Sequence, residues 1–259
     1  MANRHGDFIW YELATPDPDA SKAFYDDVVG WTVEAAPSGP IDYRMIAAAD
    51  GLVGGVARLT PDMEAGGARP AWIGYVGVDD VDASVAGLEA AGGRTRMPAT
   101  DLPGVGRLAM VADPDSAPFH VMRGASEGTS TVFTPHPTDI YGHVVWNELA
   151  SADPDRALGF YGRAFGWRQD GAMPMGELGE YRFLRHGADM IGAVMPEVMG
   201  AKGWLFYFHV PDIDAAADRV RHAGGTVEQE PVELPGGGFS MTARDPHGAR
   251  FGLVGGRMR

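Results

Sequence analysis

A segment of this chain occurs twice, and this repeat limits the possible folds more than any other feature of the sequence. "IWYELATPDPDASKAFYDDVVGW" covers 9–31 and "VWNELASADPDRALGFYGRAFGW" covers 145–167, at a constant offset of 136 residues. A second match, at an offset of 132, pairs "WIGYVGVDDVDA" (72–83) with "WLFYFHVPDIDA" (204–215). A period of this length is far longer than that of solenoid repeats. The chain is therefore predicted to contain a duplicated domain.

The length of the chain agrees with two domains of ordinary size. A chain of 259 residues is long enough for each copy to bury its own core. The segment "GASEGTSTVFTPHPT" (124–138) is rich in Gly, Ser, Thr and Pro and has no periodicity, as expected of a linker. We therefore predict a first domain over 1–124, a linker over 125–137 and a second domain over 138–259.

Composition excludes several classes of function. The absence of cysteine rules out disulfides, thiol catalysis and cysteine-ligated zinc, and it fits a cytoplasmic location. A net charge of −14 argues against nucleic acid as a partner, because phosphates require clustered Lys and Arg. No apolar run has membrane-spanning length, and the N-terminus has no signal-peptide core. We expect a cytoplasmic protein with neither a nucleic-acid nor a membrane partner.

Local patterns predict the same order of elements in each repeat. Residues 8–13 alternate as a strand does, and Asp17 can cap a following helix that ends in a left-handed turn at Gly30. Strands are then predicted over 31–35, 42–48 and 52–59, and the order starts again with a strand over 72–78.

Asp80 is the predicted cap of the second helix, and Gly92-Gly93 is its predicted end. Three more strands are expected near 94–97, 106–112 and 117–122. "LPGVG" (102–106) and its copy "LPGGG" (234–238) lack the lysine of a phosphate-binding loop, so hairpin loops are expected there.

This order, with an "FY…GW" helix end and a "VDDVDA…AGG" second helix, resembles the vicinal-oxygen-chelate superfamily. That group includes glyoxalase I, bleomycin-resistance proteins and extradiol dioxygenases. The resemblance implies an α+β fold with two tandem glyoxalase-like domains. Each domain would be a pair of βαβββ units, called modules below, that form a half-open β-barrel around a cavity. A homodimer is compatible with this organisation.

The resemblance also implies a divalent metal held by His, Glu or Gln on the first and last strands of each module. In the first copy those positions hold Trp10, Gly54 or Gly55, Ile73 and His120. In the second copy they hold Trp146, Gly192 or Ala193, Leu205 and Gly252. A metal needs several donors that converge on one point, and a lone histidine does not supply them. We therefore expect no metal cofactor: a divalent metal is compatible with the superfamily but is not supported by these residues.

Alternate residues of a strand share a face, so the predicted cavities, or cups, have a definable lining. The predicted ligand-binding residues are Trp10, Glu12, Tyr75, His120, Met122, Trp146, Glu148, Tyr207 and His209. An aromatic floor with a few polar groups suits a small organic molecule. The alternative is that the tryptophans are ordinary core residues and the histidines are ordinarily packed. His136, His143, His186, His222 and His247 show no metal-ligand spacing and are expected to face solvent.

Three classes of function remain open. The first is a metal-independent binder of a small organic molecule, as in bleomycin-resistance proteins. The second is a glyoxalase-like lyase or a dioxygenase that uses Glu12 or Glu148 as a general base, or an atypical metal site. The third is a scaffold for another protein. The aromatic cups favour the first two, and the missing metal ligands favour the first. Whether the protein is an enzyme stays open.

Overall fold

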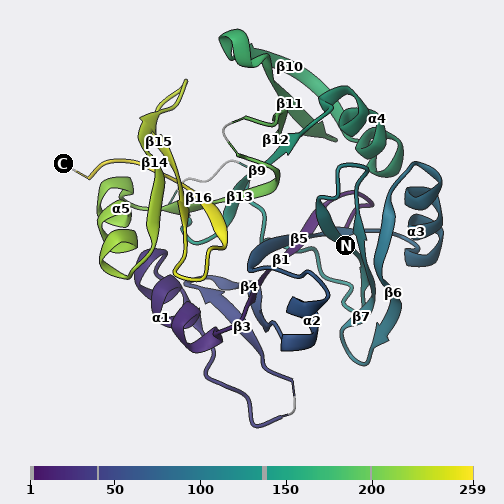
Figure 1. Cartoon of the computed structure of the whole chain (residues 1–259), viewed down its shortest axis with the longest axis horizontal. Helices are drawn as coiled ribbons and strands as arrows, with labels where there is room; N and C mark the ends of the chain where they lie inside the picture. Colours follow the sequence, from purple (N-terminus) through teal and green to yellow (C-terminus); the bar gives the residue numbers. More distant parts are fainter. Residues whose placement is uncertain (1–2, 40, 136–138, 199, 259) are drawn as a thin grey trace. The chain divides into compact units, whose positions relative to one another are not determined.

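A computed structural model describes residues 3–39, 41–135, 139–198 and 200–258 (Figure 1). The first half of the chain contains β1 (Phe8–Thr15), α1 (Pro18–Val28), β2 (Thr32–Val33), β3 (Tyr43–Ala48), β4 (Gly51–Arg58), α2 (Pro61–Ala65), β5 (Ala71–Gly77), α3 (Val81–Ala90), β6 (Arg94–Leu102), β7 (Gly106–Ala112) and β8 (Pro118–Gly124). The second half contains β9 (Val144–Ser151), α4 (Pro154–Phe165), β10 (Arg168–Pro174), the short 3-10 helix η1 (Gly176–Leu178), β11 (Glu180–His186), β12 (Asp189–Pro196), β13 (Gly203–Val210), α5 (Ile213–His222), β14 (Thr226–Glu233), β15 (Phe239–Arg244) and β16 (Arg250–Gly255).

The strands form two mixed eight-stranded sheets of identical design. Their orders are β2-β3-β4-β1-β5-β8-β7-β6 and β10-β11-β12-β9-β13-β16-β15-β14. In each module the first and last strands pair in parallel, and the remaining pairs are antiparallel. Neither sheet closes on itself. The predicted α+β fold of four βαβββ modules is confirmed, whereas α2 and η1 were not predicted and β2 is shorter than expected.

The helix boundaries follow from the predicted caps. Asp17 accepts the N–H groups of Asp19 and Ala20 at the start of α1, and Asp80 accepts that of Ala83 in α3. Gly30 follows α1 with a φ of +84°, in the left-handed region where glycine is favoured. No described helix is both long and apolar enough to cross a membrane.

The modules group into two compact units, and neither unit is a continuous half of the chain. The first compact unit comprises Met1–Ile9, Ile73–Pro135 and Trp146–Leu205. The second compact unit comprises Trp10–Trp72, His136–Val145 and Phe206–Arg259. Each therefore combines one module from each copy of the repeat: β5–β8 with β9–β12, and β1–β4 with β13–β16.

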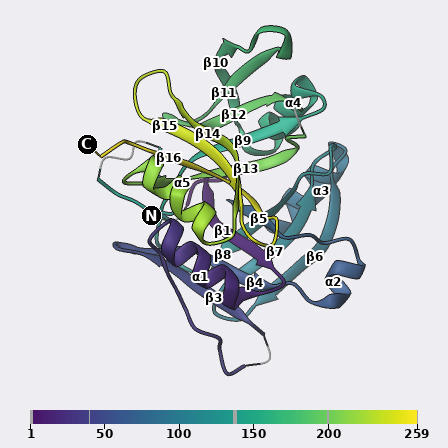
Figure 2. The same cartoon turned by 60° about the vertical axis from the view of Figure 1, so that its left-hand side comes forward.

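In the second compact unit, α1 packs beside α5 (Figure 2). The repeated Phe-Tyr pair of α1 contacts the module that carries α5. Phe24 lies against Gly225, where a Cβ atom would stand 2.8 Å from the ring. The Tyr25 hydroxyl donates a hydrogen bond to Asp245 at 3.3 Å and accepts one from the Trp72 indole at 2.9 Å. The other oxygen of Asp245 accepts two backbone N–H groups of its own turn. Burial raises the pKa of both Tyr25 and Asp245.

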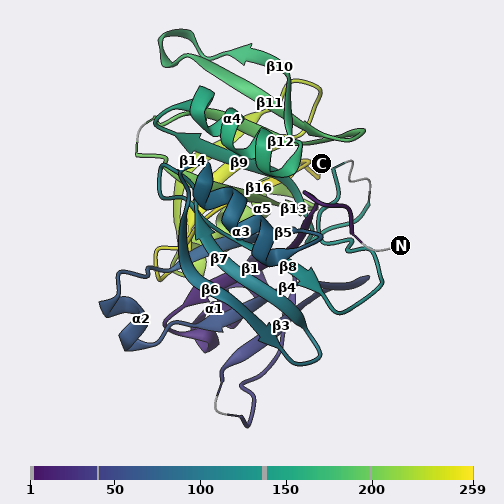
Figure 3. The ribbon, with the colours of Figure 1, turned by 90° about the vertical axis from the view of Figure 1, so that its right-hand side faces the viewer.

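The first compact unit repeats this arrangement between α4 and the module that carries α3 (Figure 3). Phe160 lies against Gly93, where a Cβ atom would stand 3.2 Å from the ring. Tyr161 donates to Asp113 at 3.1 Å and accepts from Trp204 at 3.1 Å. Two motifs that carry the resemblance, "FY" and "AGG", thus join modules from different copies of the repeat.

Two histidines that were expected to face solvent are buried or nearly so, and that prediction is wrong for them. His143 binds Asp50 at 2.8 Å in the second compact unit, and His186 binds Asp7 at 3.0 Å in the first. The offset of 136 relates the two pairs with histidine and aspartate exchanged. A hydrogen bond to an aspartate lowers the free-energy cost of burying an imidazole, because it compensates the lost hydration. His222 is exposed and His247 is half-buried, while His136 lies outside the described residues.

Candidate functional site

Strand register places one row of side chains at the same level in each module. The rows are Met45–Gly55–Glu12, Met97–Met110–His120–Tyr75, Phe183–Ala193–Glu148 and Gln229–Thr242–Gly252–Tyr207. Directly opposed residues share one face of a sheet. The rows settle the alternatives left open by the sequence: Gly55 and Ala193, not Gly54 and Gly192, are the counterparts of His120 and Gly252.

In the first module a hydrogen-bonded chain joins two of the predicted site residues. The Trp10 indole donates to the Tyr43 hydroxyl at 2.8 Å. Tyr43 in turn bonds to Glu12, and burial together with the charge of Glu12 raises the pKa of Tyr43. Tyr43 therefore stays protonated and acts as a donor to the carboxylate. Only 9 % of Glu12 is exposed.

The third module contains the same chain of contacts. The Trp146 indole donates to the Tyr181 hydroxyl at 2.7 Å, and Tyr181 donates to Glu148 at 2.7 Å. Only 7 % of Glu148 is exposed. Phe183 packs near both aromatic rings, with centroids 6.2 Å from Trp146 and 5.8 Å from Tyr181. The tryptophans themselves are half-buried.

Sequence reasoning missed Tyr43 and Tyr181. A signal was present, because "YRMI" (43–46) and "YRFL" (181–184) match in both copies. Their offset is 138, not 136, since the segment after the first helix is two residues longer in the second copy. A comparison at constant offset therefore did not align them.

In the second module His120 is deeply buried. It is 3 % exposed, and neither ring nitrogen has a partner of good geometry among the described residues. Its ring stacks on Tyr75, with centroids 4.1 Å apart. Burial lowers the pKa of His120 to about 4, an effect that the Ala109 backbone partly offsets. The imidazole is thus neutral at neutral pH, with one nitrogen as donor and the other as acceptor.

The fourth module differs at the same level. The Tyr207 ring lies over Gly252, where a Cβ atom would stand 2.3 Å from the ring. His209 bonds through Nδ1 to the Ile140 carbonyl at 2.6 Å, and its ring lies 4.7 Å from that of Tyr141. This histidine therefore fastens the segment before β9 to β13.

The predicted lining of each cup is distributed over both compact units. Trp10 and Glu12 lie in the second compact unit, whereas Tyr75, His120 and Met122 lie in the first. Conversely, Trp146 and Glu148 lie in the first compact unit, and Tyr207 and His209 in the second. The contacts described above each lie within one compact unit. The assembly of complete cups from both units stays a prediction.

The residues at the expected metal positions do not fit a metal. A ligand side chain at Gly55 would meet the Tyr43 hydroxyl, which lies 2.1 Å from where its Cβ would be. The Tyr207 ring blocks Gly252 in the same way, and Ala193 has no donor atom. Among the described residues, no group of three or more His, Cys, Asp or Glu side chains could hold a metal ion. His120 alone keeps a suitable donor.

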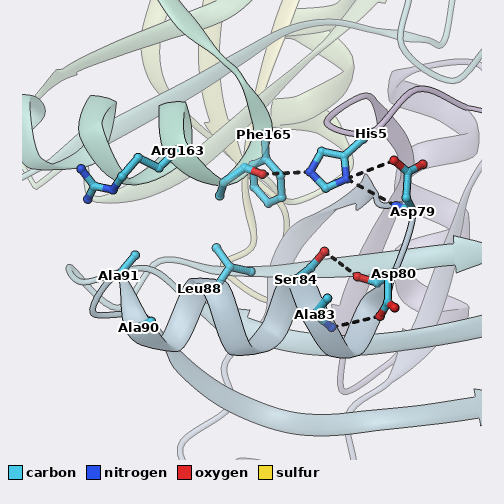
Figure 4. A pocket seen from close by; sticks show the side chains of 12 residues that line it. His5, Asp79, Asp80, Ala83, Ser84, Leu88, Ala90, Ala91, Arg163 and Phe165 are labelled. Carbon is cyan, nitrogen blue, oxygen red and sulfur yellow. Dashed lines mark hydrogen bonds and ion pairs between the residues drawn. The ribbon is translucent and has the colours of Figure 1, made fainter.

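A separate groove of about 550 Å³ lies within the first compact unit, between α3 and the end of α4 (Figure 4). Its lining is mainly small and apolar, and several polar groups serve the fold. His5 contacts the Ala164 carbonyl at 2.9 Å, and Ser84 donates to the Asp80 carbonyl at 2.6 Å. None of the predicted site residues lines this groove.

Proteins similar over nearly the whole chain are known. "Putative glyoxylase CFP32" of Mycobacterium tuberculosis (strain CDC 1551 / Oshkosh) is 33 % identical over 255 residues, which cover 97 % of this chain and 95 % of that protein. "Anthracycline biosynthesis protein DauV" of Streptomyces sp. (strain C5) is 33 % identical, with 95 % of this chain and 91 % of that protein covered.

Solved structures share the fold at lower identity. A Mn(II)-bound glyoxalase from Novosphingobium aromaticivorans has a TM-score of 0.66 and 19 % identity, over 98 % of this chain and 83 % of that one. The 2,3-dioxygenase LapB from Pseudomonas sp. KL28 has a TM-score of 0.64 and 14 % identity, over 99 % of this chain and 94 % of that one. The sequence pattern of one family matches twice, over residues 8–121 and 140–253. The chain belongs to the Glyoxalase/Bleomycin resistance protein/Dioxygenase superfamily.

Proposed function

We propose that this protein binds a small organic molecule through its Trp–Tyr–Glu chains, without the catalytic metal of the family. The observation that carries the proposal is the same hydrogen-bonded chain in both copies: Trp10–Tyr43–Glu12 and Trp146–Tyr181–Glu148. A buried carboxylate is costly unless it is hydrogen-bonded, and here a tyrosine bonds to each one.

The chemistry of the chain suits a ligand with a hydroxyl or amine hydrogen. A carboxylate has about four lone-pair sites, so the bond from a tyrosine leaves it able to accept a further donor. The tyrosine hydroxyl is oriented because it also accepts the indole N–H. Each half-buried tryptophan offers an aromatic surface next to that carboxylate. Together these groups would bind a planar molecule and fix its polar edge.

Relatives support an aromatic ligand. Two proteins similar over most of this chain are named for anthracycline biosynthesis, from Streptomyces sp. (strain C5) and Streptomyces peucetius. Anthracyclines are polycyclic aromatic compounds with hydroxyl groups, the chemistry that an indole and a carboxylate together recognise.

The absence of a metal is part of the proposal. Tyrosine rings occupy two of the positions that would carry ligands, and a lone His120 does not hold a metal tightly. Elemental analysis of the purified protein should find no stoichiometric Zn, Fe, Ni or Mn. About one tightly bound transition metal per domain would contradict this.

Catalysis is the second candidate. Glu12 or Glu148 would then act as a general base on a C–H or O–H acid, in a lyase-type or dioxygenase-type reaction. The observation in its favour is that both carboxylates are buried and held in place by a tyrosine.

One set of variants distinguishes binding from catalysis. Hydroxylated aromatic compounds are titrated into chelator-treated protein, and affinity is measured by calorimetry. Trp10→Ala and Trp146→Ala should weaken binding of an apolar ring more than Glu12→Gln and Glu148→Gln do. If the protein is an enzyme, the glutamine variants should instead lower kcat strongly while KM changes little. Glu233→Gln, an exposed glutamate on β14, is the control. Wild-type affinity in both tryptophan variants would refute the proposed site.

A further inference from the structure

One face of the second module carries a group of side chains that its counterparts lack. The row Met97–Met110–His120–Tyr75 crosses four neighbouring strands, and Met122 lies two residues beyond His120. All five residues belong to the first compact unit. We call them the methionine–histidine face.

The direction of this face follows from the strand β8. Phe119 packs against Tyr161 and Phe165 of α4, with ring centroids 5.6 and 5.9 Å apart. Successive side chains of a strand point to opposite sides, so His120 points away from these helical residues. Its cross-strand neighbours Tyr75 and Met110 share that side.

The three methionines are half-buried, so part of each side chain is accessible. A thioether is polarisable and flexible, and it makes favourable contacts with aromatic rings of varied shape. His120 is 3 % exposed, and no described residue offers a well-placed partner to either ring nitrogen. Burial of a polar group without a partner is unfavourable, and a ligand that bonds to it would remove that penalty.

We propose that the methionine–histidine face recognises a flat aromatic ligand, with the methionines against the ring and the His120 imidazole bonded to a hydroxyl group on its edge. This deepens the proposed function, on which it rests, by naming the module that selects the aromatic ligand and the side chains that contact it. The equivalent row of the fourth module, Gln229–Thr242–Gly252–Tyr207, has neither thioethers nor imidazole. The two halves of the molecule therefore differ in specificity.

The test uses alizarin, a dihydroxyanthraquinone, and alizarin dimethyl ether, in which both hydroxyl groups are masked. Full-length protein is labelled with carbon-13 in the methionine methyl groups, and each signal is assigned from Met→Leu variants. Alizarin should shift the signals of Met97, Met110 and Met122 as it binds. His120→Phe, which keeps a ring against Tyr75, should weaken the binding of alizarin about tenfold and leave the affinity for the dimethyl ether unchanged. Thr242→Val in the fourth module is the matched control and should change neither affinity.

The outcomes separate this inference from the function on which it rests. If alizarin binds and Trp10→Ala or Trp146→Ala weakens it while the three methionine signals stay fixed, the proposed function stands and the inference is overturned. If neither compound binds to the wild-type protein, the inference is also overturned, whereas the wider ligand titrations still decide the proposed function. The methionine signals are read on the wild-type fold, so an unfolded His120→Phe variant does not remove the test.

Discussion

At the scale of single residues, Glu12 and Glu148 on one side and His120 on the other are accommodated in the interior in opposite ways. Glu148 is buried but accepts a short bond from Tyr181, which compensates its lost hydration. His120 is buried without such a bond, so it is kept neutral. The first arrangement stabilises a charge, and the second leaves hydrogen-bonding capacity for another molecule.

Removal of the tyrosine hydroxyls tests the first arrangement. Tyr43→Phe and Tyr181→Phe should each lower the free energy of unfolding by about 1–2 kcal/mol, because the indole loses its acceptor and the carboxylate loses a donor. Urea unfolding followed by tryptophan fluorescence measures the change. Tyr141→Phe, at a ring that is 38 % exposed, should have almost no effect. Equal stability of all three variants would show that the Trp–Tyr–Glu chains do not stabilise the fold.

The pH dependence of unfolding tests the second arrangement. The pKa of His120 is about 4 in the folded protein, below its ordinary value of 6.5. A group whose pKa is lower in the folded protein contributes stability that is fully present at pH values above its unfolded pKa. This stability is lost as the pH falls toward the pKa of the folded protein. Between about pH 6.5 and 4 the wild-type protein should therefore lose about 3 kcal/mol more than His120→Phe. Parallel stability curves for the two proteins would contradict this.

At the scale of elements, helices α1 and α4 fasten together modules from different copies of the repeat. Each inserts a phenylalanine against a glycine that follows another helix: Phe24 against Gly225, and Phe160 against Gly93. Each also donates a tyrosine hydroxyl to an aspartate that organises a turn. The second glycine of each repeated pair, Gly93 or Gly225, therefore makes room for a ring, while the glycine before it adopts the positive φ that follows the helix.

Substitution of these glycines should destabilise the protein. A methyl group at Gly93 or Gly225 meets a backbone carbonyl at 2.9 or 2.7 Å and the inserted ring at 3.2 or 2.8 Å. Gly93→Ala and Gly225→Ala should each cost about 1–3 kcal/mol by overpacking. Gly87→Ala in α3, where no atom lies within 4 Å, should stabilise by about 0.5–1 kcal/mol because alanine favours helix. Thermal unfolding of the three variants decides the matter, and a neutral Gly225→Ala would refute the packing argument.

At the scale of the whole molecule, the duplication has diverged while its internal pairings were kept. Asp7–His186 and His143–Asp50 occupy equivalent places with the two residue types exchanged. A hydrogen bond between these side chains needs one imidazole and one carboxylate, and it works in either order. The divergence is larger in the rows of opposed strand residues, because the second copy has Gly252 at the position equivalent to His120.

An exchange of one pair tests this reciprocity. Asp50→His and His143→Asp alone should each destabilise the protein, because they place like groups together. The double variant should recover about 1 kcal/mol relative to the sum of the two single effects, as a double-mutant cycle measures. Strict additivity would show that the pair does not contribute as a unit.

The duplication, the module order and the helix caps could all be predicted from the sequence, because they depend on residues close together in the chain. Asp17, Asp80 and Gly30 act within a few residues of their own position, so their roles could be predicted directly. The strand faces that hold Trp10, Glu12 and Tyr75 also follow from alternation alone. What no local pattern contains is which strand, and which residue of it, lies opposite.

The hydrogen-bond partners of the site residues could not be predicted, because they come from distant parts of the sequence. Tyr25 meets Asp245 across 220 positions of sequence, and Tyr43 reaches Glu12 from another strand whose register depends on loop length. The burial of His143 and His186 was mispredicted for the same reason, since their aspartates lie 93 and 179 residues away. The alignment of Met97, Met110 and His120 likewise exists only once strand register is set. Long-range contacts depend on the packing of the whole chain, because the same side chain costs or gains energy according to what stands opposite it.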